Sequence, residues 1–193
     1  MSINETGDHL ASALSQKAYD HLINKEYEKA LSLYDECLEI FKSCEDCRRL
    51  AMTYNNMGLI HVQTGNFGLA MKCFEHAFSH YRALKDIDGQ ANQLQNMGSV
   101  CRDIKDHDKA VEMYLKALTF FEETKDEFQI ANQYSNIAYI HAMTHEFQDA
   151  ITWYTLSLNL YESLNDLERA GQIRKNVNTL GTAIKAAKDN EPS

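Results

Sequence analysis

The segment NFGLAMKCFEHAF, residues 66–78, places apolar side chains at Phe67, Ala70, Met71, Phe74 and Ala77. These positions follow the i, i+3, i+4, i+7 spacing of one helix face, so the segment is predicted to be an amphipathic helix. The pattern recurs when the chain is shifted by 40 residues, with an alanine in every copy and an aromatic residue four positions later: Ala30 and Tyr34, Ala70 and Phe74, Ala110 and Tyr114, Ala150 and Tyr154. A stack of repeated helical units is therefore expected, because one such unit cannot bury its apolar face alone.

Small residues recur upstream of each alanine, and a histidine or cysteine follows each of them after three positions: Ala18 and His21, Gly58 and His61, Gly98 and Cys101, Ala138 and His141. A small residue on one helix lets a second helix approach closely, and Phe74 is expected to fill the space beside Gly58. Each 40-residue unit is therefore predicted to be a pair of packed helices.

This pattern resembles the tetratricopeptide repeat (TPR), in which a Leu-Gly and a Tyr position precede an Ala-x3-Phe and a small residue. The resemblance covers about residues 11–187. The period of 40 and the missing closing proline are similar to the long repeats of kinesin light chains and of the Leu-Gly-Asn polarity adaptors. The resemblance implies an all-α fold, a right-handed α-solenoid of four TPR helix pairs plus a C-terminal capping helix.

We expect a single TPR domain over residues 9–187, between disordered ends at 1–8 and 188–193. Its parts are repeats at about 11–50, 51–90, 91–130 and 131–170, then the capping helix at 167–187. The expected helices are 9–24, 27–43, 47–64, 67–84, 87–104, 107–124, 127–144, 147–164 and 167–187. Aspartates recur just before the first helix of successive pairs and are predicted N-caps, with a capping box between Asp126 and Gln129: Asp46, Asp86, Asp126 and Asp166. The last helix carries an apolar stripe that would cover the end of the stack: Ile173, Val177, Leu180 and Ile184.

The resemblance implies that the first helices of the pairs line a concave groove that binds peptides. The residues it places there are Met52, Asn55, Asn56, Leu59, Asn92, Gln95, Asn96, Ser99, Arg102, Asn132, Ser135, Asn136, Tyr139, Gln172 and Asn176. The first helix of the chain would add Ser12, Ser15, Gln16 and Tyr19 to the same columns. Such a surface is rich in amides and nearly uncharged, with Arg102 and Lys175 as its expected cations. Amides both donate and accept, so they can bond the main chain of an extended segment.

Asparagine is a poor helix former, so its recurrence in the middle of helices needs a reason. Two explanations for Asn56, Asn96 and Asn136 stay open. Each could clamp the backbone of a bound segment, or each could bond across to the neighbouring repeat and hold the stack together.

The net charge of −9 argues against nucleic acid and against an anionic membrane surface as partners, because both attract basic faces. No apolar run reaches the length of a membrane span, and no secretory signal is visible at residues 1–10, so a cytoplasmic location is expected. Chaperone-tail binding is also disfavoured. Ser15, Asn92 and Asn96 stand where the basic residues of a TPR carboxylate clamp would fall.

No enzyme, metal or cofactor chemistry is predicted. Cys44 and Cys47 form a CxxC without a second pair, and the odd total of five cysteines fits reduced thiols. Cys73, His76 and His80 share a helix but are expected to be a core cysteine with surface histidines. The histidines of the repeated column, such as His21 and His141, lie too far apart for one metal and are interpreted as packing residues with polar tips.

The leading interpretation is a protein–protein interaction scaffold, or adaptor, that binds a peptide segment of a partner in its groove. Two alternatives stay open: a peptide-responsive signalling regulator, and a self-associating structural module. We expect a monomer or a weak homodimer. A concentration series by light scattering separates self-association from the other two interpretations.

Overall fold

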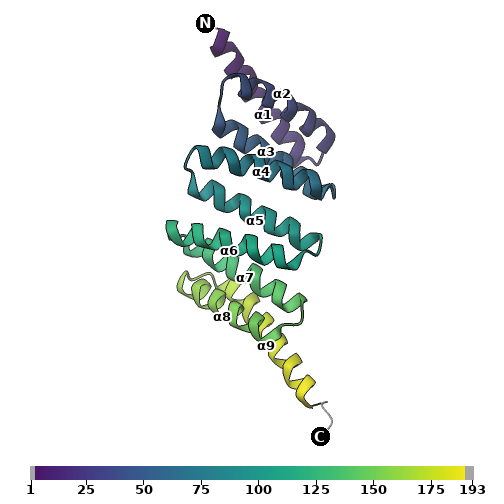
Figure 1. The fold of residues 1–193 in the computed structure, drawn as a ribbon, viewed down its shortest axis with the longest axis vertical. Coiled ribbons are helices and arrows are strands. Elements are labelled where there is room, and N and C mark those ends of the chain that lie inside the picture. The colour runs from purple at the N-terminus through teal and green to yellow at the C-terminus, as the bar shows by residue number, and fades with distance from the viewer. Residues whose placement is uncertain (1–2, 190–193) are drawn as a thin grey trace. The chain divides into compact units, whose positions relative to one another are not determined.

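The computed structural model describes residues 3–189, and within them every regular element is an α-helix (Figure 1). The nine helices of this range are α1 (Ile3–Ile23), α2 (Tyr27–Ser43), α3 (Cys47–Gln63), α4 (Phe67–Ala83), α5 (Ile87–Asp103), α6 (His107–Thr124), α7 (Glu127–Met143), α8 (Phe147–Ser163) and α9 (Leu167–Asp189). The seven helices between α1 and α9 begin and end within one residue of their predicted bounds. The all-α prediction is confirmed for the described residues.

The ends of the chain differ from the prediction. Residues 3–8 and 188–189 are helical, where the sequence predicted disorder. The remaining residues of the predicted disordered ends, 1–2 and 190–193, lie outside the described range.

The chain divides into two compact units, residues 1–93 and 94–193, with the division inside α5. In the first unit α1 packs on α2, α2 on α3 and α3 on α4. In the second unit α6 packs on α7, α7 on α8 and α8 on α9. Consecutive helices thus pair as the repeat predicts, and the fold is a TPR-like α-solenoid.

Close contacts between small and aromatic residues fix the helix pairs. A Cβ added to Gly58 of α3 would lie 2.5 Å from Phe74 Cε1 of α4, and one added to Gly98 of α5 would lie 2.8 Å from Tyr114 Cδ1 of α6. Phe74 and Tyr114 are fully buried. The predicted close approach beside glycine is therefore confirmed in both units.

One residue with a positive φ, in the left-handed region, lies in each turn between helices. These residues recur every 20 positions: Lys25, Glu45, Gly65, Lys85, Lys105, Lys125, His145 and Asn165. This conformation suits glycine, yet only Gly65 is one. The amide after the left-handed residue closes the turn, as where Asp46 N–H donates to the carbonyl of Phe41 at 3.0 Å. The short, uniform turns give the repeat its constant period.

The predicted aspartate caps are confirmed. Each carboxylate accepts from the amide three residues later, at 2.8–3.1 Å: Asp46 from Arg49, Asp86 from Gly89, Asp126 from Gln129 and Asp166 from Arg169. The capping box predicted between Asp126 and Gln129 does not form. The Asp126 N–H already donates to the Phe121 carbonyl, and Gln129 Oε1 accepts from Asn132 instead.

The last helix closes the second unit with its apolar stripe. Ile173 is buried, and Val177 and Leu180 pack against the same core cluster as Tyr154 and Tyr161 of α8. Lys175 and Asn178 point to solvent. This confirms the predicted cap for the part of α9 that contacts α8.

Candidate functional site

The predicted binding residues all lie on the first helices of the pairs and the closing helix, and none of them is fully buried. The exposed ones are Met52, Leu59, Tyr139 and Gln172; the half-buried ones are Asn55, Asn56, Asn92, Gln95, Asn96, Ser99, Arg102, Asn132, Ser135, Asn136 and Asn176. Every position is therefore open, at least in part, to a ligand. The structure gathers some of them into two grooves, one in each unit.

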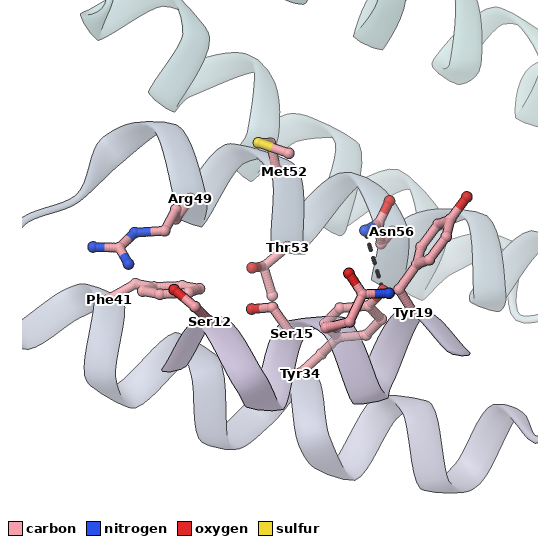
Figure 2. Close-up of a pocket in the computed structure, with 10 residues that line it drawn as sticks. Ser12, Ser15, Tyr19, Tyr34, Phe41, Arg49, Met52, Thr53 and Asn56 are labelled. Carbon is pink, nitrogen blue, oxygen red and sulfur yellow. Dashed lines mark hydrogen bonds between the residues drawn. The ribbon is translucent and has the colours of Figure 1, made fainter. Parts of the chain in front are cut away.

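The first groove lies between α1 and α3, with α2 beneath it (Figure 2). Its volume is about 330 Å³. Its lining is Ser12, Ser15, Gln16 and Tyr19 of α1, Tyr34 and Phe41 of α2, and Arg49, Met52, Thr53 and Asn56 of α3. The four α1 residues predicted for the binding columns thus face two of the α3 residues predicted for them.

Asn56 is tied to the base of the first groove. Its Nδ2 donates to the hydroxyl of buried Tyr34 at 3.1 Å, as Figure 2 shows, and its Oδ1 accepts from Asn55 at 3.4 Å. Burial raises the pKa of Tyr34, and the hydrogen bond from Asn56 opposes this rise. An amide has two N–H donors and two acceptor lone pairs, so half of the bonding capacity of Asn56 is left. The structural explanation therefore applies to Asn56, and contact with a ligand stays a prediction.

The second groove repeats this chemistry 120 residues later. Its volume is about 220 Å³, and its lining is Tyr139 and Ala142 of α7, Tyr154 of α8, and Asn176, Thr179 and Leu180 of α9. Tyr139, Tyr154 and Asn176 stand where the first groove has Tyr19, Tyr34 and Asn56. Burial raises the pKa of Tyr154, and its hydrogen bond with Asn176 opposes this rise. Tyr19 and Tyr139 are each 47% exposed, so each groove offers an accessible aromatic ring.

Other predicted residues of the second unit bond to neighbouring helices. The pairs are Ser99 with Tyr114 (3.2 Å), Asn132 with Tyr161 (2.6 Å), Ser135 with Ser157 (2.7 Å) and Gln95 with Gln133. For these four, the structural explanation applies at least in part. By contrast, no side-chain hydrogen bond joins Asn136 to any other described residue, which leaves its amide available.

Neither of the two predicted cations lines a groove. Arg102 bonds to Asp103 at 2.9 Å, and Lys175 is exposed, whereas Arg49 lines the first groove. Arg49 is bonded to Asp46 at 2.6 Å, and its guanidinium lies 4.7 Å from the centre of the Phe41 ring. Arg49 was not among the predicted groove residues, although it falls one helical turn before Met52 and Thr53 on the same face.

Several cysteines and histidines lie outside the two grooves. All five cysteines are free, and burial raises the pKa of the Cys73 thiol to about 11. His76 and His80 stack on the ring of Tyr54, with ring centres 4.8 and 5.9 Å apart from it. His21 is half-buried and bonds to Glu26, as expected of a packing residue with a polar tip. Within residues 3–189, no helix is both long enough and apolar enough to cross a membrane.

The sequence matches the tetratricopeptide repeat family over residues 9–83 and 90–163. No curated protein matches the sequence significantly. Among solved structures, the apo form of RapI is similar over 91% of this chain and 64% of its own, with a TM-score of 0.83 at 16% identity. A STAND signal-transduction ATPase with a TPR sensor, from Pyrococcus horikoshii, is similar over 86% of this chain and 26% of its own. Its TM-score is 0.80 at 16% identity.

A Rap protein complexed with competence and sporulation factor is similar over 91% of this chain and 50% of its own, with a TM-score of 0.68 at 16% identity. The chain therefore spans between 26% and 64% of the length of these three proteins. At this level of identity, the similarity shows a shared fold and nothing about function.

Proposed function

This chain belongs to the tetratricopeptide repeat family, and from that premise we propose that it binds an uncharged, extended segment of a partner protein along the first helices of its pairs. The family is one of protein-interaction modules, so binding is the general role, and the segment and its site are the proposal. The observation that carries it is the groove between α1 and α3, lined by hydroxyl, amide and aromatic side chains with one cation.

The chemistry of the grooves favours a peptide backbone over a charged ligand. The hydroxyl and amide groups of Ser12, Gln16 and Asn56 supply donors and acceptors that match successive peptide groups. The exposed rings of Tyr19 and Tyr139 add apolar contact area at low entropic cost. Asn96 and Asn136 occupy the matching positions on α5 and α7, so the second unit carries the same amide side chains in this column. In this proposal the chain binds in the cytoplasm and catalyses nothing.

A peptide-responsive regulator is the second candidate. It is favoured by the similarity to a Rap protein that was solved with competence and sporulation factor, and to a STAND protein with a TPR sensor. This chain covers 26% of the STAND protein and 50% of the Rap protein. Under this candidate, the described helices bind the peptide signal.

The test is affinity capture with the full chain as bait, followed by mass spectrometry. Replacing Asn56, Asn96 and Asn136 together by alanine should remove the captured partner and leave the helical circular-dichroism signal. Asn159→Ala is the matched control, because Asn159 is exposed on α8, a second helix of its pair. A partner retained by the triple variant, or lost with Asn159→Ala, would overturn the proposed site.

A further inference from the structure

The turn between α7 and α8 brings three potential metal ligands together. One ligand atom from each of His141, Glu146 and Asp149 lies within 4.8 Å of the other two. His141 Nδ1 and Glu146 Oε2 are 2.5 Å apart. The side chain of His141 is 21% exposed and that of Glu146 54%, so an ion could enter from solvent. These residues line neither groove and take no part in the proposed peptide binding.

The equivalent turn of the first pair, between α1 and α2, has the same histidine and glutamate but a different third residue. There His21 bonds to Glu26, and Lys29 Nζ bonds to Glu26 Oε1 at 2.9 Å, which neutralises the carboxylate. In the fourth pair, Asp149 occupies the position of Lys29. The cation of the first pair is thus replaced by a second carboxylate.

The other two pairs do not supply three ligands at this turn. The second pair has Asn66 and Leu69 at the matching positions, and the third has Asp106, which bonds to Lys109 at 2.7 Å. In the described part of the chain, neither Glu146 nor Asp149 forms an ion pair with a lysine or arginine. The amides at the start of α8 favour a carboxylate anywhere in the first turn, but they do not require it to lie beside His141 and Glu146.

The geometry points to a divalent transition-metal site in which His141 Nδ1, one oxygen of Glu146 and one oxygen of Asp149 are the protein ligands. Zinc is the cation this donor set suits best, because it accepts imidazole nitrogen and carboxylate oxygen and takes three protein ligands with water in the fourth position. Calcium and magnesium prefer oxygen ligands alone. The ion takes the place of the hydrogen bond between His141 and Glu146.

A bound ion would join the last turn of α7 to the first turn of α8. It would also neutralise the two carboxylates, which repel each other without it. The expected consequence is a metal-dependent increase in the thermal stability of the second unit, because an ion that binds only the folded state stabilises it by mass action.

The experiment is calorimetric titration of the full chain with zinc ions alone. Cys44 is exposed and Cys47 half-buried, and both thiols are free to bind zinc, so every protein carries the Cys44→Ser and Cys47→Ser substitutions. One zinc ion per chain is expected. Asp149→Lys, which gives the fourth pair the side chains of the first, should weaken binding at least about ten-fold, since even outer-shell losses cost about 10–100-fold in metal affinity.

Lys29→Asp is the reciprocal variant. It places a carboxylate beside His21 and Glu26, so the stoichiometry should rise from one ion to two. The ring resonances of His141 in nuclear magnetic resonance spectra should shift with the first ion in the parent protein, and should shift less at the same zinc concentration in Asp149→Lys. Asp149→Asn keeps the size of the side chain and serves as a second test if Asp149→Lys does not fold. Circular dichroism checks the helical content of each variant.

The site would be overturned by either of two results. One is the absence of saturable zinc binding in the protein without Cys44 and Cys47. The other is binding that Asp149→Lys and Asp149→Asn leave unchanged, because the ion would then be held elsewhere.

Discussion

The hydroxyl of Tyr34 on α2 accepts a hydrogen bond from Asn56 Nδ2 on α3 at 3.1 Å, and so joins the second helix of one pair to the first helix of the next. The bond lies at the base of the first groove, where Tyr34 is 1% exposed and Asn56 half-buried. One interaction thus holds neighbouring pairs together and orients an amide toward the groove. Asn176 and Tyr154 repeat the relationship in the second unit.

Tyr34→Phe tests how much this hydrogen bond contributes to the stability of the fold. The second pair has Phe74 at the matching position, so the ring itself is tolerated there. Losing a hydrogen bond to a group that water can still reach should lower the free energy of unfolding by about 1 kcal/mol. Urea denaturation of Tyr34→Phe, Asn56→Ala and the double variant measures the coupling between the two side chains. Additive losses would mean that the bond contributes nothing.

Gly58→Ala tests the close approach of α3 and α4. The new Cβ would lie 2.5 Å from Phe74, which is buried and cannot swing into solvent. Overpacking of this kind should cost about 1–3 kcal/mol of stability. Gly68→Ala is the control, because a Cβ there meets nothing within 4 Å. It should be neutral or stabilising, by at most about 1 kcal/mol, since alanine is the better helix former. Equal effects at the two sites would contradict the packing argument.

The helices could be predicted closely because the same signals recur every 40 residues. An aspartate cap such as Asp46 begins the first helix of a pair, and small residues such as Gly58 and Ala70 mark where two helices touch. Local signals of this kind act within one turn or one packed pair, and a single sequence records them directly.

The partners of the amide side chains could not be predicted in the same way. Asn56 and Asn136 share a column, yet one bonds to a tyrosine and the other has no side-chain bond within the described residues. Tyr114, which stands to Asn136 as Tyr34 stands to Asn56, bonds to Ser99 instead. Arg49 was missed because the predicted columns followed the family pattern, and the triad at His141 was missed because the histidines were compared only with one another.

Lys105→Gly tests the left-handed turn residues. Lys105 has φ 65°, a conformation that costs an L-residue free energy and costs glycine none. Part of the gain is lost because glycine makes the unfolded chain more flexible, so a net increase in stability of about 0.5–1 kcal/mol is expected. Gly65→Ala, at φ 74°, should lower stability by about 1 kcal/mol in the reverse experiment. Thermal and urea denaturation measure both, and a loss on Lys105→Gly would contradict the argument.

Asp166 makes the stability of the second unit depend on pH. The backbone amide of Arg169 and then its guanidinium donate to the carboxylate and lower the pKa of Asp166 below its ordinary value of 3.8. Because the folded pKa is the lower one, this contribution is fully present above the unfolded pKa and is lost as the pH falls through the folded pKa. The loss should therefore appear below about pH 4.

Asp166→Asn isolates this contribution from those of the other caps. Asparagine caps a helix about as well as aspartate but has no charge to attract Arg169. The variant should be less stable than the parent at pH 7, and the difference should shrink as the pH falls below about 4 in urea denaturation series. Glu26, Glu146, Asp46 and Asp106 also have lowered pKa values, so the parent curve falls for several reasons, and only the difference between the two curves reports on Asp166. Two parallel curves would show that the charge of Asp166 does not stabilise the fold.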